Sequence, residues 1–252
     1  MAFEHAVDKS TIPTVNILGV DIAAIDMPWL IRFTQEHVKA LSGDYMCVSN
    51  VHTTVTAYED ESYRAIQNGG ILAMPDGGPL SSVGRKRGVV NMSRTTGPSY
   101  MGEILKLGGY RHFFYGSTQE TLDKLSGVLK RDYPQSTIVG MISPPFRSLT
   151  DAEDAEIIQK INEADPDFVW IGLGAPKQEI WMAAHQGKIK GLMVGVGAAF
   201  DYYAGNIQRA PEWMQKSNLE WLYRLLQDPK RLLKRYLVTN TKFIWNAMIR
   251  GK

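Results

Sequence analysis

The chain lacks the features that would direct it out of the cytoplasm or place it across a membrane. Its 252 residues contain a single cysteine, Cys47, which excludes an intramolecular disulfide and favours a reducing compartment. Residues 1–13 have no charged segment followed by an apolar one, so we expect no signal peptide. The longest apolar run, 192–200, is too short and too rich in glycine to span a bilayer. These absences predict a cytoplasmic protein.

Sequence signals for common cofactors and for metals are missing as well. Gly172-Leu-Gly174 lacks the third glycine of the dinucleotide-binding fingerprint, because Lys177 occupies that place. There is no Gly-x-x-x-x-Gly-Lys-Ser/Thr segment, which disfavours a P-loop. The five histidines show no ligand spacing, and the pair in Asp165-Pro-Asp167 precedes its expected strand, at the wrong end of a parallel sheet. We therefore predict neither a bound metal nor a cofactor.

Short apolar runs alternate with segments of helical length along most of the chain. This alternation favours βαβ units, and hence an α/β fold with a largely parallel sheet and helices on both faces. The composition, 44% hydrophobic and 21% charged, is that of an ordinary globular protein. We expect strands at 15–20, 45–49, 71–74, 112–115, 137–142, 168–171 and 192–196. Helices are expected between them, at 28–41, 53–67, 118–133 and 151–164.

The pattern changes after Ala210-Pro211, where a basic tail of two expected helices begins. Residues 213–252 carry nine Lys or Arg against two Asp or Glu, a net charge of +7, whereas the preceding 212 residues carry nineteen against twenty-four, or −5. This asymmetry predicts an acidic partner for the tail. Cationic amphipathic helices with tryptophans are typical of an interfacial membrane element. A helical pair docked on the sheet, with its basic side in solvent, explains the pattern equally. The second helix has an apolar stripe of Leu233, Tyr236, Leu237, Ile244, Ala247 and Met248.

The segment 167–179 indicates a buried strand, a glycine turn and a helix opened by Pro176. In an open α/β sheet, ligands bind where a strand's carboxyl end faces a helix N-terminus, and the unpaired first-turn N–H groups favour anions. Lys177 adds a positive charge, and Gln178 adds an amide that both donates and accepts. A plain strand-to-helix connection is the alternative. We predict that this loop forms one wall of an active site, with Gly172, Gly174, Lys177, Gln178 and Glu179 as its residues.

Two further strand ends carry polar clusters that should face the same crevice. Asp76, in a Pro-Asp-Gly-Gly turn after the strand at 71–74, is the leading catalytic candidate, with an Asx-turn as the structural alternative. Arg94 lies beside hydroxyl groups at an expected helix start, and a guanidinium group binds phosphate in a bidentate fork. Asn50 and His52 follow the strand at 45–49, where a lone histidine is more often structural than a base.

Taken in order, these motifs resemble those of the bacterial WecG/TagA/CpsF family, which is glycosyltransferase family 26. The resemblance covers residues 15–236 and rests on Asn50, the turn at Asp76, Arg94-x-x-Gly97, Gly172-Leu-Gly-Ala-Pro-Lys-Gln-Glu179, Gly195-Val-Gly-Ala-Ala-Phe-Asp201, Arg209-Ala-Pro211 and Leu219-Glu-Trp-Leu-Tyr-Arg-Leu-Leu226. It implies a Rossmann-like α/β domain, residues 1–206, followed by an appendage, residues 207–252, that covers the site and contacts the membrane.

The resemblance also implies roles for individual residues. Asp76 matches the family's proposed catalytic base, and Asn50, Arg94 and Gln178 match active-site positions. Some members carry threonine two residues before the asparagine, where this chain has Val48 beside Ser49, so we expect contacts to the donor sugar to differ there. Four tail cations fall where appendage cations are thought to hold a diphosphate: Arg224, Arg231, Lys234 and Arg235.

The function implied by the resemblance is sugar transfer from a UDP-sugar to a saccharide linked to undecaprenyl diphosphate. Family members act with inversion, without a metal, at the anionic inner face of the cytoplasmic membrane, in the synthesis of cell-surface polysaccharides. The donor stays open among UDP-glucose, UDP-glucuronate and UDP-N-acetylmannosamine or its uronate, for capsule, exopolysaccharide or teichoic-acid-type products.

A nucleotide- or nucleic-acid-binding module is the non-enzymatic alternative, which the −5 charge before the tail disfavours. An exposed apolar tail could also be buried by self-association, so a homo-oligomer is a further expectation.

Overall fold

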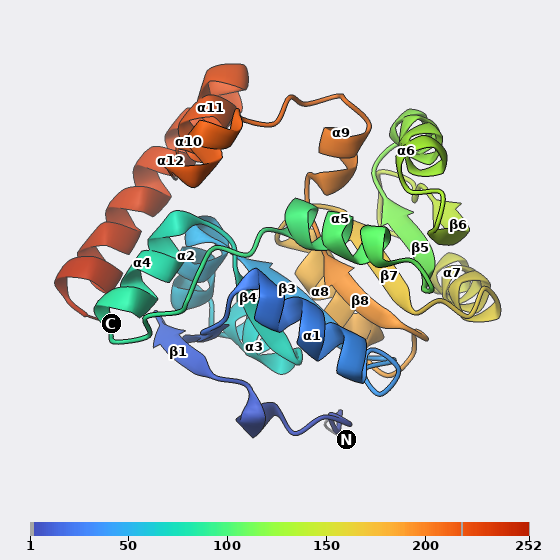
Figure 1. The fold of residues 1–252 in the computed structure, drawn as a ribbon, viewed down its shortest axis with the longest axis horizontal. Coiled ribbons are helices and arrows are strands. Elements are labelled where there is room, and N and C mark those ends of the chain that lie inside the picture. Colours follow the sequence, from blue (N-terminus) through green and yellow to red (C-terminus); the bar gives the residue numbers. More distant parts are fainter. Residues whose placement is uncertain (1–2, 218, 252) are drawn as a thin grey trace.

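The computed structural model describes residues 3–217 and 219–251, with the backbone alone for Lys216 and Arg231. Within this part of the chain, eight strands form a single sheet in the order β1-β2-β4-β3-β8-β7-β5-β6 (Figure 1). β1 and β2 are antiparallel, and all the other neighbours are parallel, which confirms the predicted α/β fold with a largely parallel sheet. The strands are β1 (Thr14–Ile17), β2 (Val20–Ala23), β3 (Tyr45–Ser49), β4 (Leu72–Pro75), β5 (Arg111–Gly116), β6 (Thr137–Ile142), β7 (Phe168–Gly172) and β8 (Leu192–Gly195).

Helices cover both faces of the sheet. Apolar side chains of α1, α5, α6 and α9 form the core on one face, and those of α2, α3, α4, α7 and α8 form the core on the other. Figure 1 shows α1 and α5 lying across the near face. The helices of this part are η1 (Lys9–Thr11), α1 (Met27–His37), α2 (Val51–Glu59), α3 (Glu61–Gly69), α4 (Gly78–Lys86), α5 (Gly97–Leu107), α6 (Gln119–Asp132), α7 (Asp151–Glu163), α8 (Lys177–His185) and α9 (Ala199–Tyr203).

Two of the expected elements are divided in the structure. The strand expected at 15–20 is a hairpin of β1 and β2, because Leu18 and Gly19 both take positive φ, 54° and 85°, and turn the chain. The helix expected at 53–67 is α2 followed by α3. Asp60 ends the first and begins the second, and its carboxylate accepts hydrogen bonds from the backbone N–H groups of Ser62 and Tyr63.

The tail forms α10 (Glu212–Lys216), α11 (Glu220–Gln227), α12 (Pro229–Phe243) and a π-helical segment, η2 (Ile244–Ile249). α12 lies against α2, and Phe243 and Ala247 are buried in the core on that face of the sheet. Part of the expected apolar stripe faces solvent instead: Leu233 and Leu237 are exposed, whereas the partly exposed Ile244 and Met248 line a cavity. The docked interpretation of the tail is confirmed for one face, while a second apolar face is exposed and the membrane interpretation stays a prediction. None of the helices in the described residues has the length and apolar character needed to cross a bilayer.

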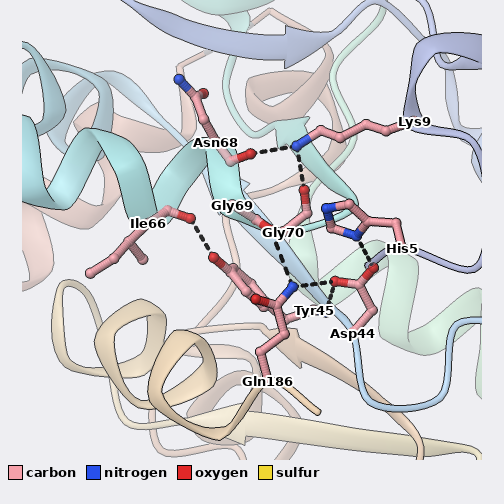
Figure 2. A network of polar contacts seen from close by, with 9 residues as sticks. All are labelled: His5, Lys9, Asp44, Tyr45, Ile66, Asn68, Gly69, Gly70 and Gln186. Atoms are coloured by element: carbon pink, nitrogen blue, oxygen red, sulfur yellow. Dashed lines mark hydrogen bonds and ion pairs between the residues drawn. The ribbon is translucent and has the colours of Figure 1, made fainter. Parts of the chain in front are cut away.

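The N-terminal segment is fastened to the amino edge of the sheet, opposite the strand ends that carry the predicted site. Lys9 donates hydrogen bonds to the carbonyl oxygens of Asn68 and of Gly70, the latter at 2.5 Å, and so places a cation at the C-terminus of α3 (Figure 2). Asp44 accepts from Gln186 at 3.0 Å and pairs with His5 at 2.5 Å. These contacts stabilise the amino ends of β3 and β4.

Candidate active site

The site lies at the point where the chain order across the sheet reverses. From β3 the chain continues to β4 on one side, while β8, the last strand, lies on the other. In open α/β sheets the crevice outside such a point is where ligands bind. A cavity of about 660 Å³ lies there. Its walls come from the loops after β3, β4, β7 and β8 and from the tail helices α11 and α12.

Asp76 is held at the floor of the cavity by the sheet itself. Its backbone N–H donates to the carbonyl oxygen of Ser49 at 2.7 Å, which extends the β3–β4 pairing by one residue. Gly77 follows with φ of 110°, a conformation that favours glycine and turns the chain into α4. Burial raises the pKa of Asp76 to about 6, and Glu220 raises it too, whereas Arg94, Arg224 and Arg209 oppose the shift. A carboxylate with a pKa near neutrality suits a general base.

Arg94 lines the same cavity but is engaged by the tail. Its guanidinium group forms an ion pair with the carboxylate of Glu220 at the start of α11, and both side chains are largely buried. A second hydrogen bond, 3.3 Å long, joins Arg94 to the backbone carbonyl of Gln215. Arg94 therefore connects the strand ends to the tail across the cavity.

Asn50 combines a structural role with a place in the cavity wall. Its side-chain oxygen accepts from the N–H groups of His52 at 3.0 Å and Thr53 at 3.2 Å, which caps α2. The cap occupies the oxygen, so the amino group is the part of the amide that can serve a ligand. Val48 also lines the cavity, whereas the neighbouring Ser49 is fully buried and donates to Gln67 at 2.5 Å. Ser49 thus does not restore a hydroxyl group to the cavity wall.

The glycine loop after β7 contributes Gly174 and Gln178 to the cavity lining. Gly172 is tightly packed, since a Cβ atom there would lie 2.6 Å from the ring of Phe200. The predicted ligand residues on either side of Gln178 lie elsewhere: Lys177 is exposed and outside the lining, and Glu179 is fully buried behind it. The backbone N–H of Gln178 donates to the carbonyl of Gly174 at 3.0 Å, so this N–H stabilises the turn and is not free for a ligand.

The predicted tail cations lie on α11 and α12, and only some of them face the cavity. Arg224 and Arg235 line the cavity, where Arg224 lies over the ring of Tyr202, 5.7 Å from its centroid. Lys234, next to Arg235, is exposed and outside the lining. The side chain of Arg231 lies outside the described part of the structure. Two of the four predicted cations are therefore brought to the predicted crevice.

The structure adds residues to the cavity that the sequence pattern did not single out for a role. Glu220 and Tyr202 line it, and His52, noted in the sequence as a structural group, lines it too. Burial lowers the pKa of His52, and the charge of Arg235 lowers it further, so the imidazole is neutral at pH 7. Arg209 donates to Ser99 at 2.7 Å behind the wall. Periodicity could not reveal Glu220 and Tyr202, because α9 and the tail reach the cavity only through the tertiary fold.

The cavity combines a carboxylate able to accept a proton with guanidinium groups able to hold a multiply charged anion. Arg94, Arg224 and Arg235 outnumber the two lining carboxylates, Asp76 and Glu220. Within the described residues, no cluster of three or more His, Cys, Asp or Glu is arranged to hold a metal ion. The arrangement suits transfer of a group from a diphosphate leaving group to a hydroxyl nucleophile.

Comparison with known proteins agrees with this chemistry. The model of the glycosyl transferase WecG/TagA/CpsF family matches residues 15–252. The chain is similar to N-acetylglucosaminyldiphosphoundecaprenol N-acetyl-beta-D-mannosaminyltransferase of Staphylococcus aureus strain MW2, with 26% identity over 231 residues that cover 89% of each chain. The proteins of the same name from strains NCTC 8325 and MRSA252 match to the same extent.

Proposed function

The chain belongs to the glycosyltransferase WecG/TagA/CpsF family, and from this premise we propose that it transfers a sugar from a UDP-sugar to a saccharide carried on undecaprenyl diphosphate. The names of its relatives specify a polyprenyl-diphosphate acceptor and an N-acetylmannosaminyl group as the one transferred. The observation that supports the proposal most directly is the cavity in which Asp76 meets Arg94, Arg224 and Arg235. Membership of an enzyme family also sets aside the non-enzymatic binding module.

The proposed reaction is a single in-line displacement. The carboxylate of Asp76 takes the proton of an acceptor hydroxyl as its oxygen attacks the anomeric carbon of an α-linked UDP-sugar. The bond from that carbon to the diphosphate breaks on the opposite face, UDP departs with the bonding electrons, and the product is β-linked. Because UDP gains negative charge as it leaves, guanidinium groups around it stabilise the transition state without a metal. Asn50, Gly174 and Gln178 supply polar contacts at the cavity wall.

We assign residues 1–206 to the catalytic unit and residues 207–252 to an appendage that completes it. The appendage contributes Glu220, Arg224 and Arg235 to the cavity lining, and the ion pair between Glu220 and Arg94 fastens it there. The strand ends supply the base, and the appendage supplies cations for the diphosphate. Residues 1–206 alone offer Arg94 as a lining cation, and the appendage adds Arg224 and Arg235.

A donor and acceptor screen tests the function. The purified chain is incubated with UDP-N-acetylmannosamine, its uronate, UDP-glucose or UDP-glucuronate and a short-chain polyprenyl-diphosphate saccharide, and released UDP and the product linkage are measured. We expect one donor to give a β-linked product, at a rate unchanged by EDTA. An α-linked product would contradict the in-line displacement, and a folded protein that releases no UDP with any pair would contradict the function.

We further propose that the tail holds the enzyme on the inner face of the cytoplasmic membrane. Exposed apolar side chains accompany its basic residues, and each basic residue near an anionic surface contributes about 1 kcal/mol of attraction. Off the membrane, the same surface is available for self-association. The exposed apolar side chains of the tail outside the cavity lining are Trp213, Leu226, Leu233, Leu237, Val238, Trp245 and Ile249.

Vesicle flotation with phosphatidylglycerol and with phosphatidylcholine tests the membrane contact. Leu237, 62% exposed on α12, is replaced by glutamate. We expect at least tenfold weaker binding to the anionic vesicles, because a negative charge replaces an apolar side chain that the membrane would bury. Leu107→Glu is the matched control, since Leu107 is an exposed leucine of α5. Equal binding by Leu237→Glu and the control would contradict the assignment of this face.

A further inference from the structure

The amide of Gln178, in the cavity wall, is fixed from two sides. Its side chain is only 3% exposed. The amide oxygen accepts from the backbone N–H of Gly197 at 3.1 Å, and the amide nitrogen donates to the carboxylate of Glu179 at 2.7 Å. A backbone N–H can only donate and an ionised carboxylate can only accept, so the two neighbours together allow one orientation of the amide.

The backbone on the other side of this amide is shaped to receive it. A Cβ atom on Gly195 would lie 3.0 Å from the Gln178 amide nitrogen and 2.8 Å from the end of the Met182 side chain, so glycine lets the backbone approach this amide closely. Gly197, two residues on, takes φ of 57° and donates its N–H to the amide. The loop after β8 is therefore built around the Gln178 side chain.

Glu179 is the end of a chain of buried donors. The hydroxyl of Tyr63 donates to its second oxygen at 3.1 Å, and the amide of Gln67 donates to Tyr63 at 3.0 Å. Ser49, at the end of β3, donates to Gln67 at 2.5 Å. Gln178 and Tyr63 both donate to the carboxylate. Burial, the larger effect, raises the pKa of Glu179, whereas these hydrogen bonds lower it. Among the described residues, no Lys, Arg or His lies within ion-pair distance of Glu179, although its side chain is fully buried.

A buried carboxylate without a cationic partner costs stability, and an uncharged side chain of similar shape would usually avoid that cost. A neutral amide in its place would weaken the constraint, because Gln offers both a donor and an acceptor to Gln178 and to Tyr63 and leaves the Gly197 N–H to hold the Gln178 amide. An acceptor-only carboxylate at this position therefore reinforces the orientation of the Gln178 amide that the Gly197 N–H also requires.

We propose that Glu179 is a positioning residue that acts through Gln178. The oriented amide retains one N–H and one carbonyl lone pair for a ligand, and it presents them to a polar substituent of the sugar bound in the cavity. This inference rests on the proposed function for the identity of the ligand. It rests on the hydrogen bonds alone for the orientation of the amide.

Kinetics on the full chain test the coupling between the two residues. We expect Glu179→Gln to lower kcat/KM by about 10- to 100-fold, because a misplaced contact has effects of this size on transfer. The double variant with Gln178→Ala should be no slower than Gln178→Ala alone, since Glu179 acts only through that amide. Tyr63→Phe, which removes the other donor to Glu179, should lower the melting temperature and leave kcat/KM within about threefold of wild type. Independent, multiplicative losses from Glu179→Gln and Gln178→Ala would overturn the proposal.

Hydrogen exchange of the Gln178 side-chain amide tests the orientation without any turnover. In spectra of the ¹⁵N-labelled protein, its two signals are identified by their loss in Gln178→Ala. We expect slow exchange in the wild type and exchange at least tenfold faster in Glu179→Gln. Unchanged exchange would overturn the proposal whether or not the protein turns over any UDP-sugar. Failure of this inference is therefore distinguishable from failure of the proposed function. Should Glu179→Gln fail to fold, Glu179→Asp, which keeps the charge and shortens its reach, gives the same readout.

Discussion

Asp76→Asn is expected to lower kcat by about 10²–10⁴-fold, the range typical for loss of general-base assistance. The amide matches the carboxyl group in size but cannot take the proton of the acceptor hydroxyl. Burial raises the pKa of Asp76 to about 6, so the wild-type rate should fall as the pH is lowered through about 6, where the carboxylate becomes protonated. The variant should lack this limb of the pH profile. Steady-state rates of UDP release between pH 5 and 8 give both measurements.

Stability separates a catalytic effect from a folding defect. A carboxyl group whose pKa is higher in the folded than in the unfolded protein costs stability as the pH rises past the unfolded value, and the cost is complete above the folded value, about 6 for Asp76. Asp76→Asn removes this cost, so its melting temperature at pH 7 should equal or exceed that of the wild type. Asp123→Asn, on the exposed side of α6, is the matched control and should retain full activity. Turnover by Asp76→Asn within threefold of wild type would show that another group accepts the proton.

The parallel strands from β3 to β8 were predictable because each is a short, largely apolar run bounded by turn residues. The hairpin of β1 and β2 was missed because its turn, Leu18-Gly19, lies inside such a run and lacks the usual Asn-Gly or Asp-Gly pair. The break between α2 and α3 left a signal that could have been used. Asp60, followed by Ser62, is a typical N-cap in the middle of the expected helix.

The strand-end residues of the site were also predictable, since parallel strands bring their carboxyl ends to one edge. Asp76, Asn50 and Gln178 meet in one cavity for this reason. The contribution of the tail was not predictable in detail, because α12 has two apolar faces and periodicity does not tell which one docks. Nor could the sequence reveal the ion pair between Arg94 and Glu220, which are 126 residues apart.

That ion pair affects which cations of the site can bind a diphosphate. Glu220 neutralises Arg94 through their ion pair. The lining guanidinium groups that remain to bind a diphosphate are therefore those of Arg224 and Arg235, both on the tail. Arg235 has a further sign of an unmet interaction, because its buried Nε has no hydrogen-bond partner among the described residues. Buried donors are usually satisfied, and a bound anion would satisfy this one.

The double variant Arg224→Ala/Arg235→Ala is therefore expected to lower kcat/KM by about 10²–10⁴-fold. A hydrogen bond to a charged group contributes about 1.5–3 kcal/mol, and about 1.4 kcal/mol corresponds to a factor of ten. Replacing both residues with lysine should give an intermediate loss, since the charge stays but the planar fork that grips a diphosphate is removed. The measurement is the initial rate of UDP release at varied donor and acceptor concentrations.

Lys234→Ala is the matched control, since it removes the same charge from the residue next to Arg235 on the same helix. Because Lys234 is exposed and outside the cavity lining, its loss should change kcat/KM by less than about threefold in detergent solution, where no anionic membrane is present. If Lys234→Ala lost as much activity as Arg235→Ala, the tail would act through its total charge. If neither variant lost activity, the diphosphate would have to be held by the strand ends alone. Only a loss confined to the cavity-lining arginines agrees with a catalytic appendage.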